Sequence, residues 1–150
     1  MNPTSAEKLT DLIGGFEHSV ISSVSAEDEI SVQSGKQTLT GKKVRTMLLC
    51  EYSGGSSTRE SVAAELLKLF LDKVTTEGEQ GIKEIFGKAE KFVQTNLDAE
   101  FISKSASLIA KYQSFGKKEL ALVGEYSGGH FVTDINATVD RFSNYRKYYG

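Results

Sequence analysis

The sequence Glu51-Tyr52-Ser53-Gly54-Gly55 decides how the chain is divided, because the same five residues return at Glu125-Tyr126-Ser127-Gly128-Gly129. Each copy follows a Gly-Lys-Lys triplet, at 41–43 and 116–118, and a short run rich in apolar residues. Upstream, the apolar positions of 9–26 also align with apolar positions of 82–99. We infer an internal duplication, with helical unit 1 at 1–75 and helical unit 2 at 76–150. The two units form either one compact domain or a tandem pair.

The composition is that of a soluble globular protein, with 39% apolar and 25% charged residues. The net charge of −2 and the mixed order of acidic and basic residues give no basic face for nucleic acid. One cysteine excludes an internal disulfide, and no apolar run approaches the ~20 residues of a membrane-spanning helix. We expect a soluble protein of the cytoplasm or of an organelle stroma, with any transit sequence already removed.

Helical periodicity dominates the chain. Apolar residues recur at intervals of three and four in Leu9–Val24, Val62–Val74 and Ile102–Ile109, as on one face of a helix. Asp98 has the place of an N-cap before one helix, and Thr133 or Asp134 starts the last helix. The pattern predicts an all-α protein of two similar helical units packed as one body, either globin-like or a helical bundle.

One stretch leaves two interpretations open. A helix over about 26–39 would place Ile30 and Leu39 inward, but Ser31, Val32 and Gly35 are poor helix formers. A strand over Glu29–Val32 is the alternative. A further helix is expected from Lys42 to Cys50, ended by Gly54-Gly55.

Chemically active residues are few. Gly35–Lys43 departs from a phosphate-binding loop, since five residues separate its glycines and Lys43 replaces the hydroxyl residue that would hold magnesium. Two histidines and one cysteine provide no cluster with the spacing of metal ligands. With no nucleophile, base and orienting group in one pattern, we predict that the protein is not an enzyme.

Four residues are candidates for ligand binding. Tyr52 and Tyr126 occupy equivalent positions in the two copies and could line a groove between the units. His130 follows the second glycine pair, and Cys50 precedes the first copy. The structural alternatives are packing at helix ends for the two tyrosines, a solvated turn for His130 and a buried filler for Cys50.

The C-terminal helix carries more apolar surface than one inward face requires. Ile135, Val139 and Phe142 form the expected inward stripe, and aromatic residues continue it around the last turn. Aromatic rings with a polar edge are common at interfaces. We therefore predict that the protein associates with itself or with a protein partner through the interface residues Phe142, Tyr145, Tyr148 and Tyr149.

Residues in the second half resemble a known family. The run Asn96–Tyr112, followed by Gly128-Gly129, Ala137-Thr138, Arg141, and Tyr145 with Tyr148-Tyr149-Gly150, is similar to the last helices of phycobiliproteins. The resemblance implies a globin-like fold and a role as a structural or light-harvesting subunit in photosynthesis. No cysteine lies near Thr138 or Val139, where the family attaches its bilin. Any bilin would therefore be bound without a covalent bond or through Cys50.

Two other functions remain open from the sequence. The first is a helical adaptor without pigment that acts through protein–protein contacts. The second is a small-ligand-binding protein that uses the groove between the two units. Neither function involves nucleic acid or a transmembrane segment.

Overall fold

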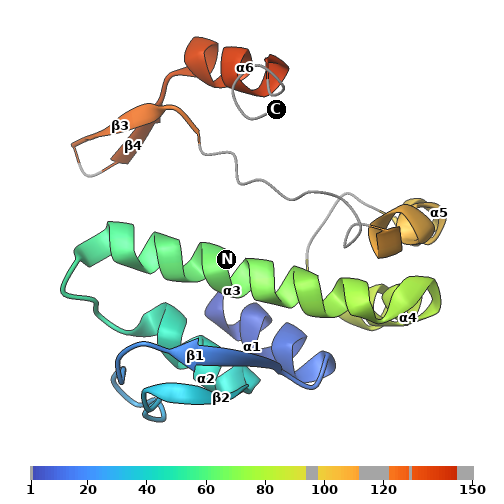
Figure 1. The fold of residues 1–150 in the computed structure, drawn as a ribbon, viewed down its shortest axis with the longest axis horizontal. Coiled ribbons are helices and arrows are strands. Elements are labelled where there is room, and N and C mark those ends of the chain that lie inside the picture. The colour runs from blue at the N-terminus through green and yellow to red at the C-terminus, as the bar shows by residue number, and fades with distance from the viewer. Residues whose placement is uncertain (1, 94–97, 112–121, 129, 145–150) are drawn as a thin grey trace. The chain divides into compact units, whose positions relative to one another are not determined.

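The computed structural model describes residues 2–93, 98–111, 122–128 and 130–144. The chain divides into two compact units, Met1–Ser114 and Phe115–Gly150. The elements follow one another along the chain as coloured in Figure 1: α1 (Pro3–Leu12), β1 (Phe16–Val20), β2 (Gly35–Leu39), α2 (Gly41–Leu49), α3 (Gly55–Thr76), α4 (Gly78–Ala89), α5 (Ala99–Ala110), β3 (Gly124–Ser127), β4 (His130–Thr133) and α6 (Ile135–Ser143).

The fold is mostly helical, as the sequence predicted, with 58% of the described residues in helices. The prediction of an all-α protein was wrong in one respect. Two small antiparallel sheets are present, one formed by β1 and β2 and the other by β3 and β4. The predicted globin-like or bundle arrangement does not account for these hairpins.

The first strand lies where the periodicity predicted a continuous helix over Leu9–Val24. Asn2 caps α1 by accepting the N–H of Thr4 at 2.9 Å, but α1 ends at Leu12. Gly14 and Gly15 then take positive φ angles of 74° and 78°, a conformation that is inexpensive only for glycine and that ends a helix. The chain reverses there and continues as β1.

The ambiguous stretch over 26–39 is not a helix. Residues 35–39 form β2, which pairs antiparallel with β1 in a register that sets Phe16 opposite Leu39. An isolated bridge between Val24 and Val32 extends the pairing toward the connecting loop. The strand alternative was thus closer to the structure, although the strand lies later than Glu29–Val32.

Helices α1 and α2 approach each other closely at Gly41. Its N–H donates to Asp11 Oδ1 at 2.8 Å, so a carboxylate on α1 caps the first turn of α2. A Cβ atom at Gly41 would lie 2.2 Å from the backbone oxygen of Glu7 and 2.7 Å from Asp11 Cγ. Only a residue without a side chain fits this contact.

Arg45 of α2 connects α1 to the loop after β1. Its Nε donates to Glu29 Oε1 at 2.6 Å and its Nη1 to Glu7 Oε2 at 3.3 Å. The hydrogen bond and the charge of Glu29, followed by those of Glu7, raise the pKa of Arg45 above its usual value. Thr46, which is buried, donates to the backbone oxygen of Ile30 at 3.0 Å and fixes the same loop.

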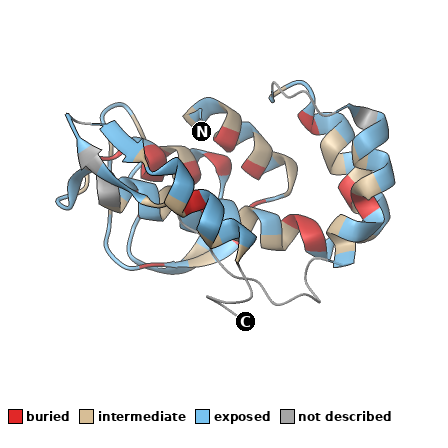
Figure 2. Ribbon diagram, turned by 90° about the horizontal axis from the view of Figure 1, so that it is seen from above, coloured by how far each residue is buried: buried red, intermediate tan, exposed pale blue. Residues whose placement is uncertain are grey.

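The first unit contains two apolar clusters. Their buried members are among the residues coloured red in Figure 2, which marks all buried residues. The larger joins the hairpin to α1, α2 and α3, with Val32 and Leu39 fully buried and Leu66 contributed by α3. The smaller is centred on Val74, Ile82 and Ala106, from α3, α4 and α5. These clusters confirm the predicted inner faces of α3 and α5.

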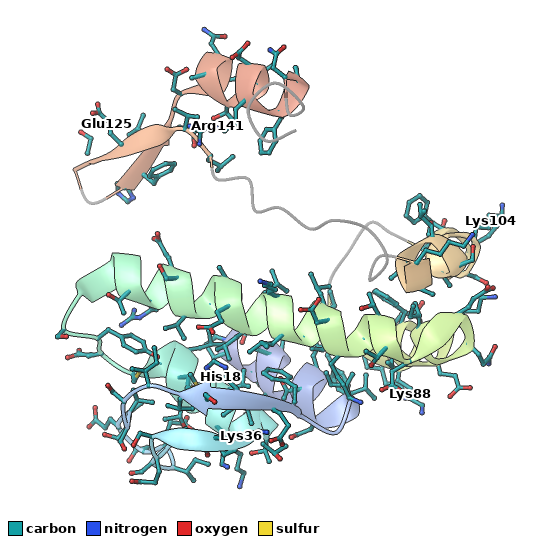
Figure 3. The ribbon with its side chains drawn as sticks, in the orientation of Figure 1. His18, Lys36, Lys88, Lys104, Glu125 and Arg141 are labelled. Atoms are coloured by element: carbon teal, nitrogen blue, oxygen red, sulfur yellow. The ribbon has the colours of Figure 1, made fainter. Side chains whose placement is uncertain are left out.

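A polar contact also joins β1 to α3. His18 of β1 lies below α3 (Figure 3), where its Nδ1 is 3.8 Å from Glu65 Oε1. At the far end of α3, Gly78 has a positive φ of 68° and separates α3 from α4. The positive φ of Gly78 lets the chain turn between α3 and α4.

In the second unit, the described residues form one hairpin and one helix. Tyr126 is opposite Phe131 and Ser127 is opposite His130 in the pairing of β3 with β4. Asp134 caps α6 by accepting the N–H of Ala137 at 2.9 Å, as predicted. Of the residues in 122–128 and 130–144 whose burial the structure describes, which excludes Tyr126, only Thr138 is buried.

The two copies of the repeated pentapeptide adopt different structures. The first lies in the connection between α2 and α3, and α3 already begins at Gly55. In the second copy, residues 125–127 lie in β3 and Gly128 follows in a turn, while Gly129 lies outside the described residues. Likewise 9–26 contains the end of α1 and all of β1, whereas 82–89 belongs to α4. Similar sequence therefore does not correspond to similar structure at these positions.

The replacement Gly41→Ala should destabilise the protein by about 1–3 kcal/mol, because the new methyl group forces α1 and α2 apart. The control is Gly87→Ala in α4, where a Cβ would meet no atom within 4 Å and alanine should stabilise by about 0.5–1 kcal/mol. Urea denaturation followed by circular dichroism measures both. Equal stability of the two variants would contradict the close approach at Gly41.

Candidate functional site

Cys50 and Tyr52 lie together in the connection between α2 and α3. The Tyr52 hydroxyl donates to the backbone oxygen of Met47 at 2.9 Å, and the buried Cys50 Sγ lies 3.5 Å from the same oxygen. Arg59 donates to the backbone oxygen of Cys50 at 3.4 Å. These contacts hold the chain as it leaves α2, which is a structural role.

The ionisation of Tyr52 reflects this setting. Burial raises the pKa of the Tyr52 hydroxyl, and its hydrogen bond and charge interaction with Cys50 raise it further, while the Arg59 charge lowers it. A tyrosine with a raised pKa stays neutral at physiological pH. It can donate a hydrogen bond there, but it does not serve as a base.

The other two candidate ligand residues, Tyr126 and His130, belong to the second unit. Tyr126 is part of β3, but its side chain lies outside what the structure describes. His130 begins β4 and is exposed. The four candidates are therefore divided between the units, with only Cys50 and Tyr52 placed together.

The C-terminal stripe has the opposite orientation to the one predicted. Ile135, Val139 and Phe142 are 71%, 56% and 42% exposed. Thr138 faces inward instead, because its hydroxyl accepts the N–H of Val123 at 2.9 Å and lies 3.3 Å from the Val123 oxygen. The other predicted interface residues, Tyr145, Tyr148 and Tyr149, lie outside the described residues.

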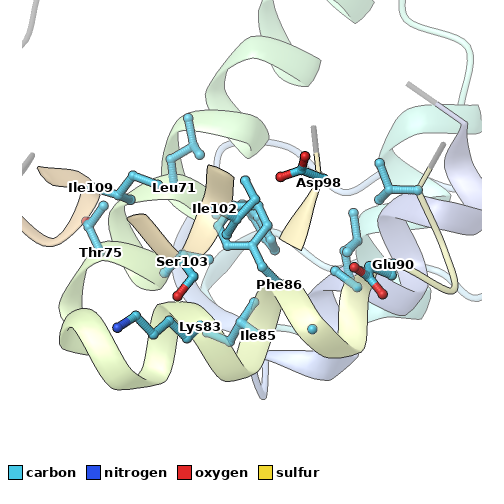
Figure 4. A pocket seen from close by; sticks show the side chains of 16 residues that line it. Leu71, Thr75, Lys83, Ile85, Phe86, Glu90, Asp98, Ile102, Ser103 and Ile109 are labelled. Carbon is cyan, nitrogen blue, oxygen red and sulfur yellow. The ribbon is translucent and has the colours of Figure 1, made fainter. Parts of the chain in front are cut away.

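A cavity lies within the first unit. It has a volume of about 300 Å³ and is enclosed by α3, α4 and α5, with a contribution from α1. Its walls are mainly apolar (Figure 4) and include Leu9, Phe70, Leu71, Phe86, Ile102 and Ile109. A second cavity of about 60 Å³ shares Leu9 and Phe70 with the first.

The cavity exists because three apolar faces converge without filling the space between them. Residues at intervals of three or four place Phe70 and Val74 on one side of α3, and Ile102 and Ile109 on one side of α5. Ala106 fills the centre of the contact with α3 and α4, and its side chain is small. A bulkier residue there would occupy more of the volume.

Sequence reasoning assigned these residues to inner faces and missed the cavity. Apolar periodicity shows which side of a helix is buried, but it does not show whether the neighbouring side chains meet. The sequence feature that could have indicated the cavity is the pair of carboxylates, Glu90 and Asp98, beside these apolar faces. Charged residues at the edge of a cluster are common, so the signal was weak.

The described residues contain no group of three or more His, Cys, Asp or Glu side chains that could hold a metal ion. Among the same residues, no helix is both long and apolar enough to cross a bilayer. The residues that line the cavity offer apolar contact with a few charges at the edge.

Several solved structures share the fold of this chain. B. subtilis TagV matches with a TM-score of 0.74 and 16% identity, over 99% of this chain and 61% of that chain. B. subtilis TagU matches with a TM-score of 0.59 and 20% identity, over 97% and 62%. A transcriptional regulator from Enterococcus faecalis matches with a TM-score of 0.65 and 20% identity, over 97% and 56%. No protein-family model and no curated protein matches the chain.

These similarities correct the functional prediction. The light-harvesting role implied by the resemblance to phycobiliproteins, and the assignment to photosynthesis, are wrong, because the matching folds are those of TagV and regulator proteins. With identities of 16–20%, the similarity concerns the fold alone. The chain spans 56–62% of the length of the structures named here.

Replacing Tyr52 by phenylalanine should cost about 1 kcal/mol at neutral pH, the usual net value of one hydrogen bond. Because the pKa of Tyr52 is raised in the folded protein, the unfolded tyrosine ionises first. The contribution of Tyr52 is therefore complete below its ordinary pKa of 10.0 and is lost as the pH rises further. Urea denaturation at about pH 7 and about pH 11 should show the difference between the two proteins shrinking. A difference independent of pH would contradict the altered ionisation.

Proposed function

We propose that this chain binds a small apolar or amphipathic ligand in the cavity between α3, α4 and α5. The supporting observation is the cavity itself. Its volume of about 300 Å³ is at the lower end of the ~300–1,000 Å³ of ligand pockets, which are also mainly apolar with a few polar groups. This site is distinct from the groove around Tyr52 and Tyr126 considered from the sequence.

The energy of an empty cavity supports the same proposal. The side chains that line an open apolar cavity lack some of the van der Waals contacts of a packed core, and this costs free energy. Water that enters relieves part of the cost, and an apolar ligand relieves more, because it restores the missing van der Waals contacts.

We propose a binding role rather than a catalytic one. The cavity wall is mainly apolar, and the Lys83 ammonium at its edge is engaged by Glu79 Oε1 at 2.7 Å. A nucleic-acid role has less support despite the regulator among the similar structures. A net charge of −2 gives the protein little attraction for a phosphate backbone.

Filling the cavity with a larger side chain should weaken ligand binding. In Ile102→Trp the indole would occupy the cavity from α5, and in Leu71→Trp it would cover the edge from α3. Binding of decanol to the full chain, measured by displacement of the neutral dye Nile red, should weaken about tenfold or more, which corresponds to about 1.4 kcal/mol.

The control is Ile21→Trp, because Ile21 is 94% exposed and does not line the cavity. Its affinity for decanol should equal that of the wild type. Circular dichroism establishes that each variant is folded. Unchanged affinity in folded Ile102→Trp and Leu71→Trp, or no binding of decanol to the wild type, would exclude this cavity as the ligand site.

A second candidate function is protein association through α6, with self-association as the form to be tested. Ile135, Val139 and Phe142 form a continuous stripe along the helix and are exposed. In a unit of this size with only Thr138 buried among the residues whose burial the structure describes, such a stripe supports a contact surface.

Placing a charge in this stripe should weaken self-association. Val139→Lys removes a side chain whose burial contributes about 1.5–3 kcal/mol, so the dimer dissociation constant should rise about tenfold or more. Asn136→Lys, at an exposed position of α6 outside the stripe, is the matched control and should leave the constant unchanged. Sedimentation velocity over a range of concentrations measures both. A wild-type protein that stays monomeric at every concentration would contradict the proposal.

A further inference from the structure

The charges around the cavity are distributed unevenly. Three charged residues line it: Lys83 on α4, Glu90 directly after α4, and Asp98, the N-cap of α5. Figure 4 shows Lys83 on one side of the apolar side chains and both carboxylates on the other. The cavity therefore has an acidic end and a basic end.

The basic end is neutralised within the protein. The Lys83 Nζ lies 2.7 Å from Glu79 Oε1, one turn earlier on the same helix. Lys8, another cation of the first unit, lies over the ring of Phe92 at 5.4 Å from its centroid and does not line the cavity. An anionic ligand group would have to compete with Glu79 for the ammonium of Lys83.

The acidic end keeps its charge. The Glu90 side chain is exposed, and no hydrogen bond or ion pair links it to another described residue. Asp98 accepts the N–H of Phe101 at 2.6 Å as the N-cap of α5, which satisfies one acceptor and leaves the negative charge. Two carboxylates therefore line this end, and among the residues that the structure describes no cation is paired with either of them or lines the cavity beside them.

From this arrangement we infer that the ligand is a cationic amphiphile, with an apolar body in the cavity and a protonated amine at the end formed by Glu90 and Asp98. The inference rests on the proposed binding function and names the chemical class of its ligand. A carboxylate head group would be repelled there, and a hydroxyl group would gain no charge interaction. The ammonium is the head group whose charge complements this end.

The experiment compares decylamine, decanol and decanoate, which share a similar apolar chain and differ in charge. Each is titrated below its micelle concentration against the full chain near neutral pH, where the amine is protonated and the acid ionised. Decylamine should bind about threefold to tenfold more tightly than decanol, as expected for two exposed charge pairs. Decanoate should bind most weakly, and added salt should reduce the difference.

The variant that tests the assignment is Glu90→Gln/Asp98→Asn. Asparagine also caps helices well, so α5 should be retained. The preference for decylamine over decanol should disappear while the affinity for decanol stays the same. The control is Glu84→Gln/Glu100→Gln, which makes the same change in net charge on α4 and α5 at residues that do not line the cavity. This control should keep the preference.

The possible failures are distinguishable. If decanol binds but decylamine binds no better, or decanoate binds best, the inferred ligand class is wrong and the binding function stands. A preference lost equally in both double variants would show an effect of net charge and would also overturn the assignment to Glu90 and Asp98. If none of the three compounds binds, the proposed function itself fails.

Discussion

The contact between the Asp11 carboxylate and the Gly41 N–H is the constraint on which most of the first unit depends. It lets α1 reach the backbone of α2, because residue 41 has no side chain to hold the helices apart. β1 begins shortly after α1 ends, and β2 ends shortly before α2 begins. Fixing the two helices therefore also fixes the start of β1 and the end of β2. It also closes the cluster that includes Val32, Leu39 and Leu66. Leu66 of α3 completes that cluster. The turns of α3 that come after Leu66 supply one wall of the cavity.

Helices were predictable from the sequence where periodicity and caps agree. α2, α3, α5 and α6 all begin within a few residues of the expected positions, and Asp98 and Asp134 cap their helices as the sequence predicts. The strands were missed because apolar residues after Leu12 continue the helical intervals, while the break depends on the backbone angles of Gly14 and Gly15. Periodicity describes which positions are apolar. It does not include the cost of the angles through which the chain must pass.

The candidate site was less predictable than the fold, for two physical reasons. A cavity is a difference between the volume enclosed by helices and the volume of their side chains, and an apolar pattern gives neither quantity. The repeated pentapeptide also directed attention to Tyr52 and Tyr126, but identical residues formed a loop in one place and a strand in the other. Neighbouring elements decided that outcome: the first copy is joined to α2 through the Tyr52 contact with Met47, whereas the second pairs with β4. Local sequence identity was outweighed by tertiary context.

The sparse burial in the second unit affects how the chain loses its structure. The first unit has two apolar clusters, whereas in 122–128 and 130–144 Thr138 is the only buried residue among those whose burial the structure describes. Backbone hydrogen bonds and those of the Thr138 hydroxyl are among the contacts that join these residues. Regions with few buried apolar contacts open at a small fraction of the global free energy. Melting of such a chain is not an all-or-none transition, so one midpoint temperature would describe neither unit. The amide protons of β3, β4 and α6 would exchange with solvent while those of α2 and α3 remained protected.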